Sequence, residues 1–144
     1  MDAAILAQDI LSAPDVEGIT ISGGEPFLQS EGLFELITLL REKKDLGVII
    51  YTGMCFSEVK NDKLVGLSDL IIDGEYREEL NDGLSLRGSS NQNIIQLTSR
   101  YSDVIDVYGT KGRKIELHVF NDKVTMVGIP SKNSIESLES NSKK

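Results

Sequence analysis

The sequence predicts an α/β protein whose sheet is mostly parallel and is followed by an antiparallel hairpin. Short runs rich in β-branched residues recur at 17–22, 47–51 and 68–74, and stretches of helical periodicity separate them. The run at 47–51 is almost continuously apolar, which is typical of a strand that is covered on both faces. Two alternating segments, 114–120 and 123–128, flank an Asn-Asp pair and predict a β-hairpin. We expect this hairpin to extend the sheet.

Helices are predicted before and between these strands. Residues 2–11 carry apolar side chains at helical spacing, and Pro14 stops the pattern. Residues 30–44 repeat Leu, Ile and Phe with the same period, and 57–67 form a shorter third segment. The resulting βαβαβ pattern predicts right-handed crossovers and places ligands beyond the C-terminal ends of the strands.

Length and charge limit the class of protein. A chain of 144 residues with 40% hydrophobic residues is expected to form one domain with an ordinary core. Fifteen Lys and Arg against 23 Asp and Glu give a net charge of -8, which argues against nonspecific nucleic-acid binding. The apolar runs are far shorter than the roughly 20 residues that cross a bilayer, so no membrane association is expected. The start of the chain has no basic export signal, which predicts a cytoplasmic protein.

The last residues and the rare residue types set further limits. The chain becomes rich in Ser, Asn, Glu and Lys near its end, so we expect a domain over 1–130 and a disordered tail over 131–144. The single cysteine, Cys55, and the single histidine, His118, exclude an internal disulfide and a Cys/His zinc finger. Cys55 is expected to be a small packed side chain, His118 a surface strand residue and Tyr51 a core residue.

A glycine-rich turn comes directly after the first predicted strand. Gly23 and Gly24 allow positive φ and a close approach of the backbone to a ligand, and Pro26 restricts the backbone at the end of the turn. Neither GxGxxG nor GxxxxGK[ST] is present, and the carboxylate of Glu25 would repel a phosphate. The turn therefore predicts a cradle for a small ligand with an ammonium group, such as a zwitterionic amino acid. An ordinary Gly-Gly-Glu-Pro turn carries equal weight.

Five segments, in order along the chain, resemble one enzyme family. Residues 18–29, GITISGGEPFLQ, resemble the motif that binds the amino group of S-adenosylmethionine (SAM) in radical SAM enzymes. VIIYTG at 48–53, DLIIDGEY at 69–76, LRGSSNQ at 86–92 and ELHVFNDKVTMVGIP at 116–130 are similar to small activases of glycyl-radical enzymes. The group they resemble is that of the anaerobic ribonucleotide-reductase activating proteins. The resemblance implies a partial (βα) barrel of the radical SAM type.

One part of the family pattern is missing. Relatives bind a [4Fe-4S] cluster through CxxxCxxC, upstream of the segment with which this chain begins, and Cys55 does not match a family ligand. We therefore expect an N-terminal truncation, a misplaced start or a degenerate paralogue. If a first strand is missing, the exposed sheet edge at 19–22 is expected to favour self-association.

The resemblance implies a specific chemistry. In intact relatives the cluster binds the amino and carboxylate groups of SAM and cleaves SAM reductively to a 5′-deoxyadenosyl radical. That radical takes a hydrogen atom from a glycine of a partner enzyme, such as anaerobic ribonucleotide reductase. The SAM-binding residues implied for this chain are Gly23, Gly24, Glu25, Pro26, Thr52 and Asp73. No catalytic or metal-ligating residue is assigned, and Asp73 can equally belong to an Asp-Gly turn.

Two other interpretations stay open for this polypeptide. The missing cysteine ligands favour a noncatalytic module that binds SAM or the partner, and a fragment without independent activity is the third hypothesis. The loop at 87–92 is dense in hydrogen-bond donors, and the family pattern places it at the edge of the site, where Arg87 suits a carboxylate. A solvated polar loop is an equal alternative.

Overall fold

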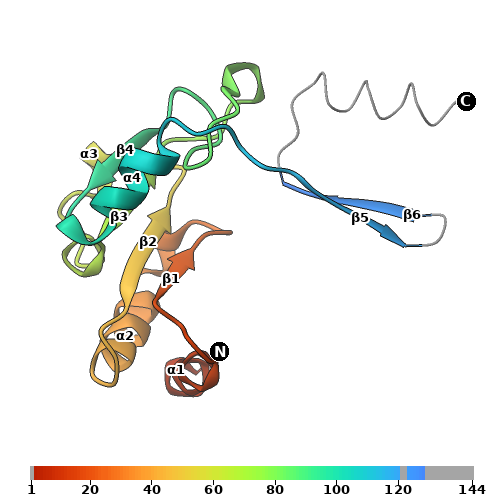
Figure 1. The fold of residues 1–144 in the computed structure, drawn as a ribbon. Helices are drawn as coiled ribbons and strands as arrows, with labels where there is room; N and C mark the ends of the chain where they lie inside the picture. Colours follow the sequence, from red (N-terminus) through yellow and green to blue (C-terminus); the bar gives the residue numbers. More distant parts are fainter. Residues whose placement is uncertain (1, 121–122, 129–144) are drawn as a thin grey trace, which may run out of the picture.

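The computed structural model describes residues 2–120 and 123–128 (Figure 1). The helices are α1 (Ala3–Ser12), α2 (Ser30–Arg41), α3 (Phe56–Val59) and α4 (Ser102–Tyr108). The strands are β1 (Gly18–Ile21), β2 (Gly47–Tyr51), β3 (Leu70–Asp73), β4 (Asn93–Gln96), β5 (Glu116–Phe120) and β6 (Lys123–Val127). The α/β class is therefore confirmed. The Asn-Asp turn of the hairpin and the expected tail at 131–144 lie outside the described residues.

Four strands form the main sheet, in the order β1-β2-β3-β4. β1, β2 and β3 run parallel, as predicted, and β4 pairs antiparallel with β3. The hairpin β5–β6 forms a separate two-stranded sheet that stands apart from the first (Figure 1). The expectation that the hairpin extends the main sheet is thus wrong, because β4 takes the edge of β3. The partial barrel stays a prediction.

The core lies between the sheet and α2. Every residue of β3 is buried, and Val48 and Ile50 of β2 have no exposed surface, as the continuous apolar runs predicted. Ile37 of α2 packs against this sheet, whereas Leu36 and Leu40 of the same helix pack against α1. The apolar residues of α2 therefore make two contacts, one with the sheet and one with α1. These contacts fix the position of the sheet.

The predicted helices form, but two are shorter than predicted, and α2 ends at Arg41 although the periodicity predicted a helix over 30–44. α1 begins after Asp2, whose side chain accepts hydrogen bonds from the Ala4 and Ile5 N–H groups and so caps the helix. α3 covers only Phe56–Val59, although the periodicity predicted a helix over 57–67. Beyond α3 the Asp62 carboxylate accepts the Leu64 N–H (2.8 Å), and Val65–Leu67 form a separate 3₁₀ turn.

The length and polarity of the helices bear on membrane insertion. Within the described ranges, every helix is too short or too polar to span a bilayer.

Candidate functional site

Glu25 joins the glycine-rich turn after β1 to the end of β2. Its Oε1 accepts hydrogen bonds from the Thr52 hydroxyl (2.6 Å) and the Phe27 N–H (3.2 Å). Its Oε2 accepts one from the Gly53 N–H (3.0 Å). The carboxylate therefore caps the short 3₁₀ turn Pro26–Gln29 and braces two neighbouring strand ends. The sequence predicted Glu25 as a site residue but not these partners.

Gly23 and Gly24 shape the exposed part of the turn. Their φ angles are 79° and 57°, in the left-handed region that favours glycine. A Cβ atom added to Gly23 would meet nothing within 4 Å, so the backbone conformation and not crowding calls for glycine there. No described residue hydrogen-bonds to the backbone of either glycine. The turn thus presents its peptide groups to solvent beside the Glu25 carboxylate.

Thr52 and Pro26 are buried behind this turn. Thr52 is 4% exposed, and its hydroxyl donates to Glu25 while accepting a hydrogen bond from the Met54 N–H (3.1 Å). Pro26 is buried at the start of the 3₁₀ turn. Both buried residues lie on the core side of Glu25 and help to fix its position.

Asp73, at the end of β3, lies in the same row of strand ends. It is 4% exposed, and its Oδ2 accepts the Phe56 N–H (2.7 Å). Its Oδ1 accepts the Asn93 N–H (3.0 Å) and the Asn93 side-chain amide (2.8 Å). Asp73 therefore ties β3 to α3 and β4, and these bonds hold the floor of the site.

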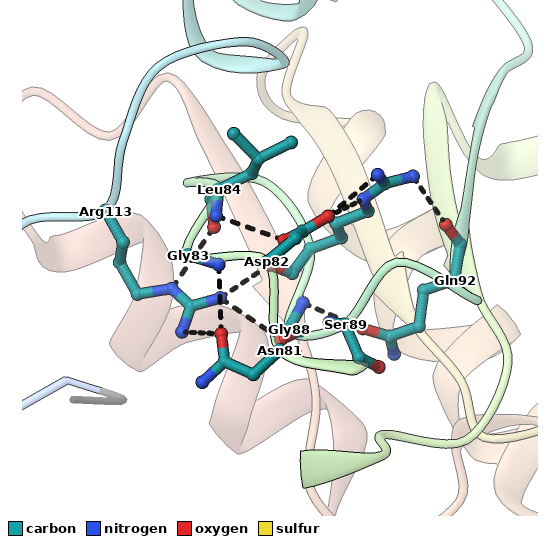
Figure 2. A network of polar contacts seen from close by, with 9 residues as sticks. Asn81, Asp82, Gly83, Leu84, Gly88, Ser89, Gln92 and Arg113 are labelled. Atoms are coloured by element: carbon teal, nitrogen blue, oxygen red, sulfur yellow. Dashed lines mark hydrogen bonds and ion pairs between the residues drawn. The ribbon is translucent and has the colours of Figure 1, made fainter. Parts of the chain in front are cut away.

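The long loop after β3 is braced by two arginines (Figure 2). Arg87 directs its Nε (2.8 Å) and Nη2 (2.7 Å) to one oxygen of Asp82, and its Nη1 to the Gln92 carbonyl (3.2 Å). Burial raises the pKa of Asp82, but the Leu84 N–H and the Arg87 guanidinium outweigh it, so the pKa lies below its usual value. The Arg87 fork thus binds a carboxylate, as its chemistry predicted, and that carboxylate belongs to the loop itself.

Arg113 was not predicted as a functional residue. Its guanidinium donates to the carbonyls of Leu84 (3.2 Å), Arg87 (2.7 Å) and Gly88 (3.3 Å), which closes the loop from the far side (Figure 2). Tyr51 attaches the same loop to β2, because its hydroxyl donates to the Leu86 carbonyl (3.0 Å). Tyr51 is only partly buried, which places it at the edge of the core.

Two other predicted positions can be compared with the structure. His118 is exposed on β5 and lies 3.4 Å from Glu116, which confirms a surface strand residue. Cys55 is exposed just before α3, so the expectation of a packed thiol is wrong. It is exposed because it occupies the N-cap position, where the chain turns outward from the strand end.

Charged residues occupy the opposite, N-terminal ends of the strands. Asp69 is 4% exposed and accepts hydrogen bonds from Arg41 (3.0 Å), the Val48 N–H (2.9 Å) and the Thr98 hydroxyl (2.6 Å). Tyr101 lies so close to the strand starts that a Cβ on Gly47 would stand 2.1 Å from its hydroxyl. At this end of the sheet, Asp69 is therefore the shared acceptor of an arginine, a backbone N–H and a hydroxyl.

Comparison with known proteins identifies the class. The chain belongs to the 4Fe-4S single cluster domain family, whose model matches residues 2–95. It is similar to the anaerobic ribonucleoside-triphosphate reductase-activating protein of Enterobacteria phage T4, with 29% identity over 87 residues, 58% of this chain and 56% of that protein. The chain thus spans little more than half the length of this relative. No solved structure matches it. The resemblance to the activase-like radical SAM family is confirmed.

The residues of this chain do not fit a [4Fe-4S] cluster. Such clusters are held by several cysteine thiolates, and the 144-residue sequence has one cysteine, Cys55. In the described ranges, no three His, Cys, Asp or Glu side chains gather as a metal site. Cluster ligands of the family kind are therefore not supplied by these residues.

Proposed function

We propose that the row of C-terminal strand ends binds S-adenosylmethionine, and that the chain is the SAM-binding part of an activating enzyme for a glycyl-radical enzyme. The observation that carries the proposal is the Glu25 carboxylate, which is fixed by Thr52 and Gly53 beside two exposed glycines. A cytoplasmic location and a partner such as anaerobic ribonucleotide reductase belong to the same proposal.

The turn suits the methionyl end of SAM because it combines a negative charge with free peptide groups. An ionised carboxylate offers about four lone-pair positions. Three described groups, on Phe27, Thr52 and Gly53, donate hydrogen bonds to the Glu25 carboxylate. Its remaining lone-pair position and its negative charge suit the ammonium group. The positive φ angles of Gly23 and Gly24 let the ligand approach the backbone closely.

The other implied residues act by holding this turn. Pro26 and Thr52 are buried and set the position of Glu25, and Asp73 fixes the neighbouring strand end through Phe56 and Asn93. We assign them as positioning residues of the SAM site. No step is assigned to an iron–sulfur cluster, because this chain does not supply its ligands.

The single cysteine favours a second candidate function, a noncatalytic binding module. Such a module would keep the SAM cradle or the partner surface without cleaving SAM. The two functions differ in whether iron is held together with SAM, so one reconstitution separates them.

Calorimetric titration with SAM tests the site. We expect weak binding by the parent chain and an affinity about tenfold lower for Glu25→Gln, which removes the charge and leaves the shape. Glu35→Gln, an exposed change on α2, is the matched control and should leave the affinity unchanged. Equal affinity of Glu25→Gln and the parent would place SAM elsewhere or nowhere on this chain.

Anaerobic reconstitution with iron and sulfide tests the cluster. The purified chain is expected to hold far less than one [4Fe-4S] cluster per molecule, measured by iron content and visible absorption. A stoichiometric cluster would contradict this and would support SAM cleavage by the chain itself. SAM binding without a cluster would support the noncatalytic module for this polypeptide.

A further inference from the structure

Gln29 lies against the glycine-rich turn that carries Glu25. A Cβ atom added to Gly24 would stand 3.2 Å from the side-chain nitrogen of Gln29, Nε2. Gln29 is the last residue of the 3₁₀ turn Pro26–Gln29, and the Glu25 carboxylate caps the start of that turn through the Phe27 N–H. The Gln29 amide and the Glu25 carboxylate therefore both lie beside Gly24.

The side chain of Gln29 is not used by the fold, unlike the two that follow it. Gln29 occupies the N-cap position of α2, but its side chain makes no capping hydrogen bond. The Ser30 hydroxyl donates to Asp62 (2.7 Å). Glu31 pairs with Lys63. Gln29 is exposed, and within the described ranges no group hydrogen-bonds to its side-chain amide, so this amide is available to a ligand.

The methionyl end of SAM carries two opposite charges on one carbon atom. The proposed function gives its ammonium group to Glu25, so a partner for its carboxylate has to lie close by. Glu25 and Asp73 are themselves carboxylates and only accept hydrogen bonds when ionised. The Thr52 hydroxyl already donates to Glu25. The side-chain amide of Gln29 supplies two N–H donors beside Gly24 and meets this need.

Ser22 is the other exposed side chain at this turn that can donate a hydrogen bond. It follows β1 and precedes Gly23. Its atoms stay more than 4 Å from the Cβ position of Gly24, whereas Gln29 Nε2 reaches it. The geometry favours Gln29.

We propose that Gln29 binds the carboxylate of SAM through its side-chain amide while Glu25 binds the ammonium group. The inference rests on the proposed function and adds how the site selects its ligand. Gly24 serves both contacts, because a Cβ atom there would displace the Gln29 amide and would be unfavourable at a φ of 57°. The site therefore distinguishes SAM from a related cation that lacks the carboxylate.

The test compares calorimetric titrations with SAM and with decarboxylated SAM, which keeps the ammonium and sulfonium groups. The parent chain should bind SAM about tenfold more tightly, because a hydrogen bond to a charged group is lost in the analogue. Gln29→Ala should lower the affinity for SAM about tenfold and leave the affinity for decarboxylated SAM unchanged. Glu25→Gln should lower both affinities, since both ligands carry the ammonium group.

Gln29→Glu gives a result that a purely structural role would not produce. Glutamate keeps the shape of the side chain and replaces the amide donor by a negative charge. Binding of SAM should fall further than in Gln29→Ala, because two carboxylates repel, and binding of decarboxylated SAM should rise about threefold. Gln8→Glu makes the same change of charge at an exposed position of α1 and should leave both affinities unchanged. Circular dichroism checks that each variant is folded.

The outcomes separate this inference from the proposed function. SAM binding that depends on Glu25 and not on Gln29 would overturn the role of Gln29 and leave the SAM site in place. An equal loss of both ligands in Gln29→Ala would also overturn it, because Gln29 would then act only on the shape of the turn. A loss of SAM affinity in Ser22→Ala and not in Gln29→Ala would assign the carboxylate to Ser22. If the parent bound no SAM, or if Glu25→Gln bound SAM like the parent, the proposed function and this inference would both fail.

Discussion

The two ends of the main sheet contrast in what their polar residues leave exposed. At the N-terminal end, Asp69 takes up Arg41, Thr98 and a backbone N–H, and Tyr101 covers the glycines at the strand starts. At the C-terminal end, Glu25 and Asp73 also bridge neighbouring elements, but the Gly23–Gly24 turn beside Glu25 is exposed.

The difference shows how similar carboxylates are neutralised by arginines at one end and paired only with neutral donors at the other. Both ends need buried acceptors, because strand ends leave N–H groups without ladder partners. At the N-terminal end Arg41 and Arg100 lie beside Asp69 and neutralise its charge. At the C-terminal end the donors to Glu25 are neutral N–H and O–H groups, which leave its negative charge uncompensated. Such a charge attracts a cationic ligand.

The largest expected effect is at the N-terminal end of the sheet. Asp69→Ala leaves the Arg41 guanidinium, the Val48 N–H and the Thr98 hydroxyl without their shared acceptor, and should lower the free energy of unfolding by about 3 kcal/mol. Urea unfolding followed by circular dichroism measures it. The exposed Asp106→Ala on α4 is the control and should change stability by less than about 0.5 kcal/mol. A loss below about 1 kcal/mol for Asp69→Ala would break the contrast.

The next effect concerns Asp73, at the C-terminal end of the sheet. Asp73→Ala removes the acceptor for the Phe56 N–H and for both Asn93 donors and should cost about 2 kcal/mol. Asn93 is exposed, so water replaces part of the loss, and the cost stays below that of Asp69→Ala. Amide exchange should become faster at Phe56 and Asn93. A cost larger than that of Asp69→Ala would show that the C-terminal end contributes more to stability than the N-terminal end.

The sequence predicted the parallel part of the sheet and missed its fourth strand. Continuous apolar runs identify β2 and β3 because a strand buried on both faces needs them. β4 has only Ile94 and Ile95 as apolar residues, so its pairing with β3 depends on contacts that no local pattern carries. The alternation that predicts a hairpin fixes how β5 and β6 pair, and it does not specify which sheet they join.

The candidate site, like the sheet, was predicted only in part from the sequence. The glycines and Glu25 were predicted because turn chemistry and the family motif are local in sequence. The brace between Glu25 and Thr52 joins residues 27 positions apart, so Thr52 was predicted without its role. Arg113 was missed because its partners on the loop are mostly backbone carbonyls, which any residue possesses. Only the fold brings such a pair together.

A smaller effect on stability is expected at the exposed Gly23–Gly24 turn. Gly24→Ala should lower the free energy of unfolding by about 1 kcal/mol, because its φ of 57° is unfavourable for a residue with Cβ. Gly32→Ala on α2 is the opposite control, since its Cβ meets nothing and alanine favours the helix by about 1 kcal/mol. Urea midpoints should move in opposite directions. If the urea midpoint of Gly24→Ala moved in the same direction and by the same amount as that of Gly32→Ala, the turn would accept a Cβ atom without strain.

The smallest effect uses two tyrosines, one at each end of the sheet. Burial raises the pKa of Tyr51 above 10.0, against a lowering effect of Arg113, and burial together with Asp69 raises the pKa of Tyr101. The folded state therefore favours the neutral phenol. Its contribution to stability is fully present below pH 10 and is lost as the pH rises through each raised pKa.

Tyr51→Phe and Tyr101→Phe should each make the urea midpoint less dependent on pH above 10, because each removes one such ionisation. The exposed Tyr108→Phe is the matched substitution for a tyrosine outside the two strand ends. Absorbance titration of the phenolates, read beside the midpoints, links each loss of stability to its own tyrosine. If Tyr101→Phe left the alkaline loss of stability unchanged while Tyr51→Phe reduced it, burial and Asp69 would not raise the pKa of Tyr101, and the contrast between the two ends of the sheet would fail.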